Sequence, residues 1–418
     1  MTLDSDRADT KVCQIWGMQA EKGRWILLFL GMAINLCLGS VYSWSVFVSP
    51  LTEFFTGTLG QSVTAGEILM PFSVFLAFFA IAMPLTGKYL DKHGPRKIII
   101  AGGILTGLGW VLASFSTSVF MLFILYGVIG GLGVGIAYGA PVAAAARWFP
   151  DRRGFAVGLV LLGFGFSAFI TANLAGYLIG NIGVMNTFRI FGLAFVILIV
   201  LLALPFRFPP DGWIPKGYSG AAYTSQACSL DLPSMIRTGQ FYALWICYFI
   251  GCLAGLMAIS IAKPVGSEVV GVGGALGTML VGFFAICNGG GRPVFGALTD
   301  KISPKNTAVA SFLLIGGSSL LLGLSPSVPV YILAFALLWG CLGGWLAIAP
   351  ASTARYFGTA DYPRCYGVIF LAYGAGAIAG PQIAGYIRDT TGSYLDVFPV
   401  ITVLSAVGIV TAFFLKDK

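Results

Sequence analysis

The stretch GKYLDKHGPRK at residues 87–97 returns in altered form as GALTDKISPKN at residues 296–306. Asp91 of the first copy and Asp300 of the second stand 209 positions apart. The same offset relates three further pairs of residues: Pro141 with Pro350, Gly158 with Gly367, and Gly165 with Gly374. An offset of half the chain, repeated at this many positions, indicates two similar units.

Composition places most of the chain in lipid. Of 418 residues, 57% are apolar and 10% are charged, and the mean hydropathy is +0.90, whereas soluble domains carry about 25% charged residues. Backbone groups inside a bilayer must be paired within their own helix, so each span needs about 20 apolar residues. The sequence therefore predicts an all-α membrane protein. Its net charge of +8 comes from short basic clusters, which favour membrane orientation over nucleic-acid binding.

Twelve apolar stretches alternate with turn or charge signals. They lie near residues 25–50, 63–87, 98–117, 119–146, 155–180, 186–206, 241–264, 276–299, 306–324, 328–354, 365–387 and 394–415. The segments on one side hold 20 of the 24 Lys and Arg residues, whereas the other loops hold only Arg189, Lys263 and Arg388. Because basic residues mark the cytoplasmic side, we expect a multi-pass plasma (inner) membrane protein with both termini in the cytoplasm.

The longest polar stretch, residues 207–240, is rich in Pro, Gly and Ser and is typical of a linker. It divides the chain into a cytoplasmic N-tail (1–24), a six-helix half (25–206), the cytoplasmic linker (207–240) and a second six-helix half (241–415). Two such halves, related by an axis along the membrane normal, place a substrate site near the midplane of the bilayer, at their interface.

Arg292 is the one cation predicted at bilayer depth. A charge there costs about 2.5–3.5 kcal/mol on insertion scales, so it persists where it faces a partner or a watery cavity. Every Asp and Glu is predicted in a tail, a loop or a span end, so we expect an anion from solution as the partner, bound by the guanidinium fork. The alternative is that Arg292 lies nearer the cytoplasmic end and snorkels.

Other polar side chains at bilayer depth are candidate ligands. Asn288 precedes Arg292 by one turn on the same helix face, where it either steers the guanidinium, binds substrate or only bridges helices. Tyr138 and Tyr42 carry hydroxyl groups at similar depth on other spans, and for Tyr138 helix bridging is again the alternative. The eight cysteines are scattered without metal-binding spacing, and we expect no metal or other cofactor.

A G-x-x-x-D-x-x-G-x-R-K pattern lies between the second and third spans and consists of Gly87, Asp91, Gly94, Arg96 and Lys97. With this pattern the chain resembles the major facilitator superfamily. The strings LGSVYSWSVF, ARWFPDRRG and NGGGRP resemble the oxalate/formate antiporter and monocarboxylate transporter branch of that superfamily. The resemblance implies the major facilitator fold of twelve transmembrane helices in two pseudo-symmetric halves.

The charged residues of this motif are candidates for gating. Asp91 beside Arg96, Lys97 and Arg152 can form a charge-assisted cluster that holds the cytoplasmic ends together in one conformation. Asp300 is the equivalent carboxylate of the second half. The alternative is that the basic residues only orient and solubilise the loops.

The resemblance also implies substrate contacts. Arg292 corresponds to the carboxylate-binding arginine of helix 8, and Tyr373 stands where the oxalate exchanger has a lysine on helix 11. A dianion would then meet one buried cation instead of two, which favours a monocarboxylate such as lactate or pyruvate, with Tyr373 donating a phenolic hydrogen bond. Animal monocarboxylate transporters couple protons through a lysine on helix 1 and an aspartate before the arginine. Here helix 1 has no lysine and Asn288 replaces the aspartate.

We therefore expect a secondary active transporter of small monocarboxylates that works by alternating access, as a monomer in contact with membrane lipid, with a proton as candidate co-substrate. Exchange of carboxylates in the oxalate/formate manner and a transporter-like sensor are the alternatives. An enzyme would need a metal cluster or a nucleophile with a base among the spans, where the only histidine, His93, is a loop residue. A channel would need a ring of filter residues.

Overall fold

The computed structural model describes residues 14–15, 18–58, 60, 62–210, 213–215, 230–358 and 361–416. A short hairpin, β1 (Gln14–Ile15) with β2 (Met18–Gln19), precedes a bundle of helices. The N-terminal half contains α1 (Ala20–Leu38), the 3-10 helix η1 (Gly39–Ser43), α2 (Trp44–Glu53), the π-helix η2 (Phe54–Thr58), α3 (Ala65–Ala113), α4 (Val119–Leu122), the π-helix η3 (Phe123–Gly130), α5 (Gly131–Trp148), α6 (Arg153–Ile182) and α7 (Val184–Ala203). The short α8 (Leu232–Met235) leads to the C-terminal half, which contains α9 (Gly239–Val269), α10 (Gly274–Ile302), α11 (Pro304–Leu324), α12 (Val328–Phe357), α13 (Tyr362–Thr391) and α14 (Val397–Ala412).

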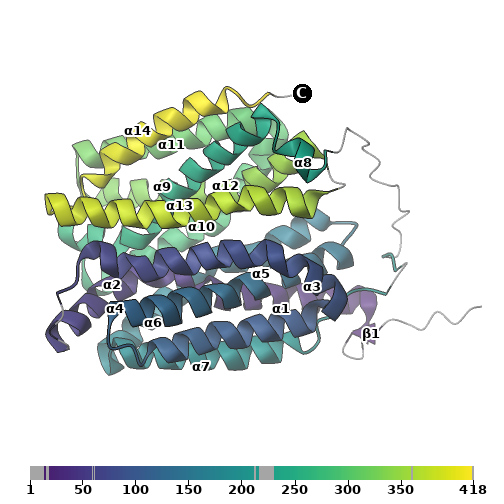
Figure 1. Cartoon of the computed structure of the whole chain (residues 1–418), viewed down its shortest axis with the longest axis horizontal. Coiled ribbons are helices and arrows are strands. Elements are labelled where there is room, and N and C mark those ends of the chain that lie inside the picture. The colour runs from purple at the N-terminus through teal and green to yellow at the C-terminus, as the bar shows by residue number, and fades with distance from the viewer. Residues whose placement is uncertain are drawn as a thin grey trace, which may run out of the picture.

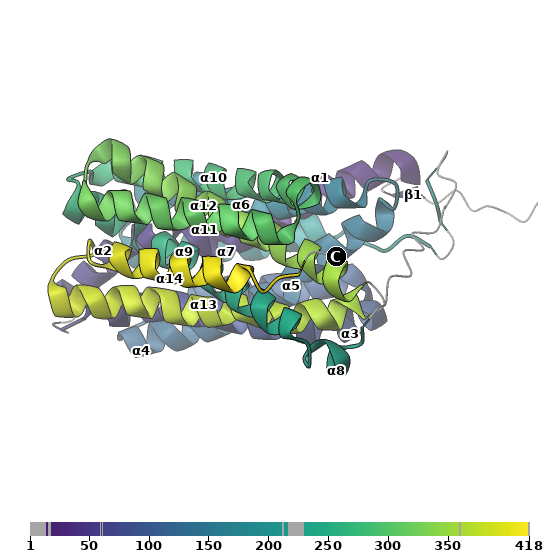
Figure 2. The ribbon, with the colours of Figure 1, turned by 90° about the horizontal axis from the view of Figure 1, so that it is seen from above.

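The long helices lie side by side along the long axis of the molecule, with the two halves stacked against each other (Figure 1). Most of the contact between the halves is made by three helix pairs, α3 with α13, α6 with α10, and α2 with α9, and smaller contacts join α2 to α10 and η1 to α9. The hairpin, α8 and the described C-terminal end of the chain lie at one end of the bundle in both views (Figures 1 and 2). We call this the linker end and the opposite end the far end.

The predicted spans reappear as helices. Eleven helical segments among the described residues are long and apolar enough to cross a membrane. The twelfth predicted stretch, 394–415, forms α14, which has 16 residues and is about 24 Å long, less than the ~30 Å hydrocarbon core. The twelve expected spans are thus eleven of full length and one short apolar helix. The first helix begins at Ala20, five residues before the predicted start of the first span.

A glycine makes the turn inside the motif between the second and third spans. The helix α3 contains two spans, Ala65–Gly87 and Lys92–Ala113, and it is broken at Gly94, which has φ 76° and ψ 164°. Side chains rarely tolerate this positive φ, so glycine is the natural residue there. Pro95 follows with the φ that suits the first turn of a helix. The Gly-Pro pair therefore ends one span and begins the next.

Candidate functional site

Arg292 of α10 lies at the interface between the two halves. The residue is 4% exposed, and its Nη1 atom donates a hydrogen bond to the carbonyl oxygen of Leu161 on α6, in the other half. Its Nε and Nη2 atoms are buried and have no hydrogen-bond partner. These two nitrogens form one edge of the guanidinium group, which presents two parallel N–H donors of the kind that a carboxylate accepts.

Glycines bring the helices together around Arg292. A Cβ at Gly165 of α6 would lie 2.9 Å from Oδ1 of Asn288 and 2.9 Å from Cα of Gly289, both on α10. A Cβ at Gly291 would overlap the carbonyl of Gly340 on α12. Because the backbones of α6, α10 and α12 approach this closely, the side chain of Arg292 reaches across to α6.

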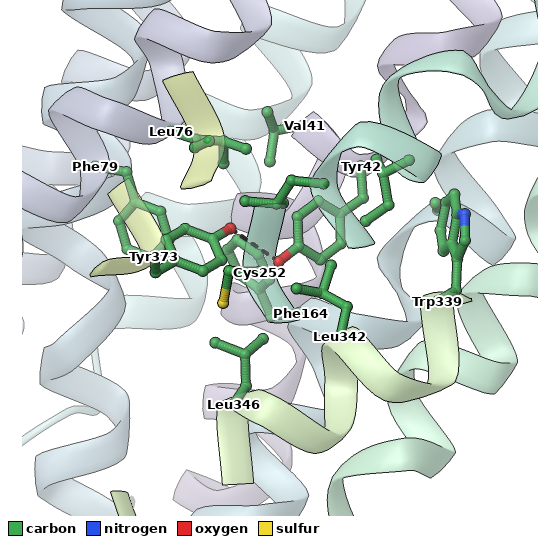
Figure 3. Close-up of a cluster of buried hydrophobic side chains, with 14 of the residues drawn as sticks. Val41, Tyr42, Leu76, Phe79, Phe164, Cys252, Trp339, Leu342, Leu346 and Tyr373 are labelled. Atoms are coloured by element: carbon green, nitrogen blue, oxygen red, sulfur yellow. Dashed lines mark hydrogen bonds between the residues drawn. The ribbon is translucent and has the colours of Figure 1, made fainter. Parts of the chain in front are cut away.

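Tyr42 and Tyr373 meet across the same interface. Their hydroxyl oxygens are 3.0 Å apart and hydrogen-bonded (Figure 3), and the two residues are 0% and 1% exposed. Tyr42 belongs to η1, a 3-10 interruption of the first span, and such interruptions often mark functional sites. Gly39 of η1 leaves no room for a side chain against the backbone of Phe164. The close approach of η1 to α6 therefore sets the position of the Tyr42 ring.

Phe164 connects the tyrosines to the arginine. Its ring centroid lies 5.1 Å from that of Tyr42 and 5.2 Å from that of Tyr138, both edge-to-face. The guanidinium carbon of Arg292 lies 6.0 Å from the same ring. Arg292 interacts electrostatically with the hydroxyl groups of Tyr42 and Tyr138, and it lies near enough to the Tyr138 hydroxyl for a weak hydrogen bond, although no hydrogen bond of normal geometry joins them. The structure therefore gathers the cation and three predicted tyrosines, Tyr42, Tyr138 and Tyr373, around an aromatic wall.

The charge of Arg292 is not balanced by a buried carboxylate. Among the described residues, Arg24 and Arg292 are the buried basic side chains, and the buried set contains no Asp, Glu or His. Arg24 is paired with Asp151 at 2.6 Å, so this carboxylate balances Arg24 and not Arg292. A buried cation without a counter-charge is costly unless an anion reaches it. The side chains around Arg292 are buried, so the site is closed in this conformation.

Asn288 lies between helices at the same level. Its Nδ2 atom donates a hydrogen bond of 3.0 Å to the carbonyl oxygen of Trp339 on α12, so the side chain bridges α10 and α12. Its Oδ1 atom is buried without a partner. The helix-bridging role considered for Asn288 is present, and a role toward the substrate stays a prediction.

The predicted gating residues lie at the linker end. Arg96, Lys97, Arg152 and Asp300 are exposed. The side chain of Asp91 lies outside the described residues, so the proposed cluster around it stays a prediction.

An ion pair that the sequence does not predict lies at the linker end. Nη1 and Nη2 of Arg24 donate to the two carboxylate oxygens of Asp151 at 2.6 and 3.1 Å, and Nη1 also donates to the carbonyl of Trp148. Burial alone would raise the pKa of Asp151, but the hydrogen bonds and charge of Arg24 outweigh it and lower the pKa below its usual value. The sequence signals this pair only through Arg24, a cation at the edge of the first apolar stretch, within the predicted N-tail.

Comparison with known proteins agrees with this architecture. A family model described as the Major Facilitator Superfamily matches residues 28–276 and 244–418. The oxalate:formate antiporter of Oxalobacter formigenes is 31% identical over 377 residues, covering 88% of this chain and 86% of the antiporter. Monocarboxylate transporter 12 of Mus musculus is 24% identical, covering 92% of this chain and 82% of its own length. A solved bacterial homologue of the human lysosomal transporter Spinster, inward-facing and unoccupied, has a TM-score of 0.66 at 16% identity and 94% coverage of both chains, a likeness of fold.

Proposed function

Because the chain belongs to the Major Facilitator Superfamily, we propose that it carries small monocarboxylates of the lactate and pyruvate type across the plasma (inner) membrane by alternating access. A transporter of this superfamily is not an enzyme. In the proposed cycle, Arg292 takes the carboxylate in a cavity between the halves, and the halves then rock about the occupied site.

The observation that carries this proposal is the unpartnered edge of Arg292. The Nε and Nη2 atoms are buried in the interface without a hydrogen-bond partner, and leaving charged donors unpaired costs free energy. A carboxylate that accepts both N–H groups removes this cost and compensates the charge. The binding energy of the substrate thus arises where the two halves meet, which is where it can stabilise their closed state.

The choice of a monocarboxylate rests on charge. Arg292 is the one buried cation near the site among the described residues, since Arg24 is occupied by Asp151. Tyr373 offers a hydroxyl group in place of a second cation. A second carboxylate would therefore enter a low-dielectric site without a partner, at a cost of several kcal/mol. The relatives are named for oxalate and formate exchange and for monocarboxylate transport, which supports a small carboxylate as the class of substrate.

A proton is proposed to travel with the substrate. The buried residues that the structure describes include no carboxylate and no histidine that could titrate near Arg292. A carboxylic acid can instead bring its own proton, and entry as the acid avoids moving a net charge. Bound as the acid, the substrate still accepts a hydrogen bond from Arg292 through its carbonyl oxygen, but only the anion compensates the charge of Arg292. Co-transport by this route needs no titrating protein group.

Exchange of carboxylates is the second candidate. An empty, closed carrier leaves Nε and Nη2 of Arg292 unpaired, so its reorientation without substrate is unfavourable. This favours a carrier that returns only when loaded, and the 31% identical relative is named as an antiporter. The same arginine therefore fits either mode.

Uptake by purified protein in liposomes tests the proposal. We expect labelled lactate and pyruvate to accumulate and oxalate to compete weakly; no uptake of any of these, or preferred uptake of oxalate, would contradict the assignment. Vesicles loaded with an unlabelled acid separate the two modes. Uptake into empty vesicles that acidifies the lumen indicates symport, whereas uptake only into preloaded vesicles indicates exchange.

A further inference from the structure

At the far end, a carboxylate of one half binds the first turn of a helix of the other half. Oδ1 of Asp389, on α13, accepts a hydrogen bond from the backbone N–H of Ala65 at 2.8 Å, and Oδ2 accepts one from the N–H of Gly66 at 3.0 Å. Ala65 and Gly66 are the first two residues of α3. We propose that Asp389 is a latch that holds the far end of the transporter closed and must release α3 when that end opens.

The latch completes a cap that α3 makes only in part by itself. Thr64 and Glu67 form a capping box, in which the Thr64 hydroxyl oxygen accepts from the Glu67 N–H at 3.2 Å and the Glu67 carboxylate accepts from the Thr64 N–H at 2.9 Å. The N–H of Ile68 donates to the carbonyl of Thr64. The two remaining donors of the first turn, on Ala65 and Gly66, are those that Asp389 binds. Separation of the halves would expose both and remove a negative charge from the positive end of the helix dipole.

The residues of α13 that precede Asp389 on the same helix face pack closely against α3. A Cβ at Gly385, one turn before Asp389, would overlap Gly66. Nε2 of Gln382, a further turn away, lies 3.4 Å from the Gly66 carbonyl oxygen and 3.5 Å from the Ser73 hydroxyl. Positions 382, 385 and 389 follow the helical repeat, so they form one face directed at the other half.

The neighbouring charges leave Asp389 free for this role. The adjacent Arg388 donates to Glu268 of its own half at 2.8 Å. A longer-range electrostatic attraction also crosses between the halves at the far end, between Lys263 of α9 and Glu53 of α2. Asp389 is itself exposed, so water can replace its partners when the halves separate. Such a contact biases the equilibrium between closed and open states and does not lock it.

The inference rests on the alternating-access part of the proposed function and is tested by a distance in the absence of substrate. Nitroxide labels at Asn181→Cys and Ala275→Cys, in a cysteine-free background, report the far-end separation of α6 and α10 by double electron–electron resonance. Both positions are exposed, and Gly176 packs against Thr278 close by. Asp389→Ala should raise the ratio of far-end-open to closed molecules about two- to tenfold. Asp389→Asn, which keeps one acceptor oxygen but no charge, should give a smaller rise and serves if Asp389→Ala does not fold.

The matched control is Asp396→Ala. Asp396 is also an exposed carboxylate of the C-terminal half near the far end, and its side chain makes no capping hydrogen bond, so its loss should leave the distances unchanged. An unchanged distribution in both Asp389 variants, or an equal shift in Asp396→Ala, would overturn the latch. Because no substrate is present, failure of the latch is distinct from failure of the substrate assignment, which would appear as lost uptake with normal distances.

Discussion

The replacement of Arg292 by lysine separates geometry from charge. Lysine keeps the positive charge but offers a single ammonium group in place of the two parallel donors of the Nε–Nη2 edge, which are unpartnered in the closed structure. A hydrogen bond to a charged group contributes about 1.5–3 kcal/mol. The loss of one such bond should weaken substrate binding by roughly 10- to 150-fold, whereas a site that needs only a positive charge would change little.

The assay is the KM for labelled pyruvate in liposomes, together with the Kd from calorimetry on purified protein. Arg24→Lys is the matched control, because Arg24 is the other buried arginine of the described chain and its fork is used by Asp151. That control should lower thermal stability and leave KM within about twofold, well below the change expected at Arg292. If Arg292→Lys keeps the KM of the wild type in folded protein, the bidentate site does not exist.

Three further sets of substitutions test the rest of the site and its support. Tyr373→Lys adds a second cation beside Arg292, and oxalate should then compete against lactate about tenfold better or more; unchanged inhibition constants would contradict the charge argument. Tyr42→Phe and Tyr373→Phe each remove the 3.0 Å hydroxyl contact, so each single change should lower the melting temperature. The double change should lower the free energy of unfolding by less than the sum of the single changes, with a coupling energy of about 1 kcal/mol. Asp151→Asn should lower the free energy of unfolding by about 1.5–3 kcal/mol at pH 7. Because the pKa of Asp151 is lowered on folding, its contribution to stability is present above about pH 4 and fades as the pH falls below that value. The melting temperatures of the variant and the wild type should therefore converge in acid.

The fold followed from the sequence because its main determinants are local and repeated. Apolar length defines a span, and the offset between Asp91 and Asp300 defines two related halves. The predicted fold and family are confirmed by the match to the superfamily model and by the likeness to a solved transporter. The length of α14 was less predictable, since the helix ends at Ala412 while the apolar sequence continues through Phe413, Phe414 and Leu415.

The site was predictable in its polar members only. Arg292, Tyr42 and Tyr373 were identified because charged and hydroxyl groups stand out within apolar runs. The carbonyl of Leu161 and the ring of Phe164 carry no such signal, because any residue has a carbonyl and phenylalanine is common in spans. Their roles depend on the close approach of α6 to α10, which is a property of the packed tertiary structure. The contact of Asp389 with α3 was not predictable for the same reason, since a carboxylate at the end of a span does not indicate which helix it will meet.

The hydroxyl pair of Tyr42 and Tyr373 has a consequence for substrate tolerance. Either oxygen can act as the donor in their hydrogen bond, so the pair can reverse its polarity by rotating two O–H bonds. In either orientation, the tyrosine that accepts keeps a free O–H, which can donate to a neighbouring oxygen that can only accept, as in a 2-oxo acid. The oxygens also keep lone pairs that can accept from water or from a hydroxyl group of the substrate. A carrier with this pair would bind the oxidised and the reduced acid of a redox couple with similar affinity. The net flux of the two acids would then follow the ratio of their concentrations.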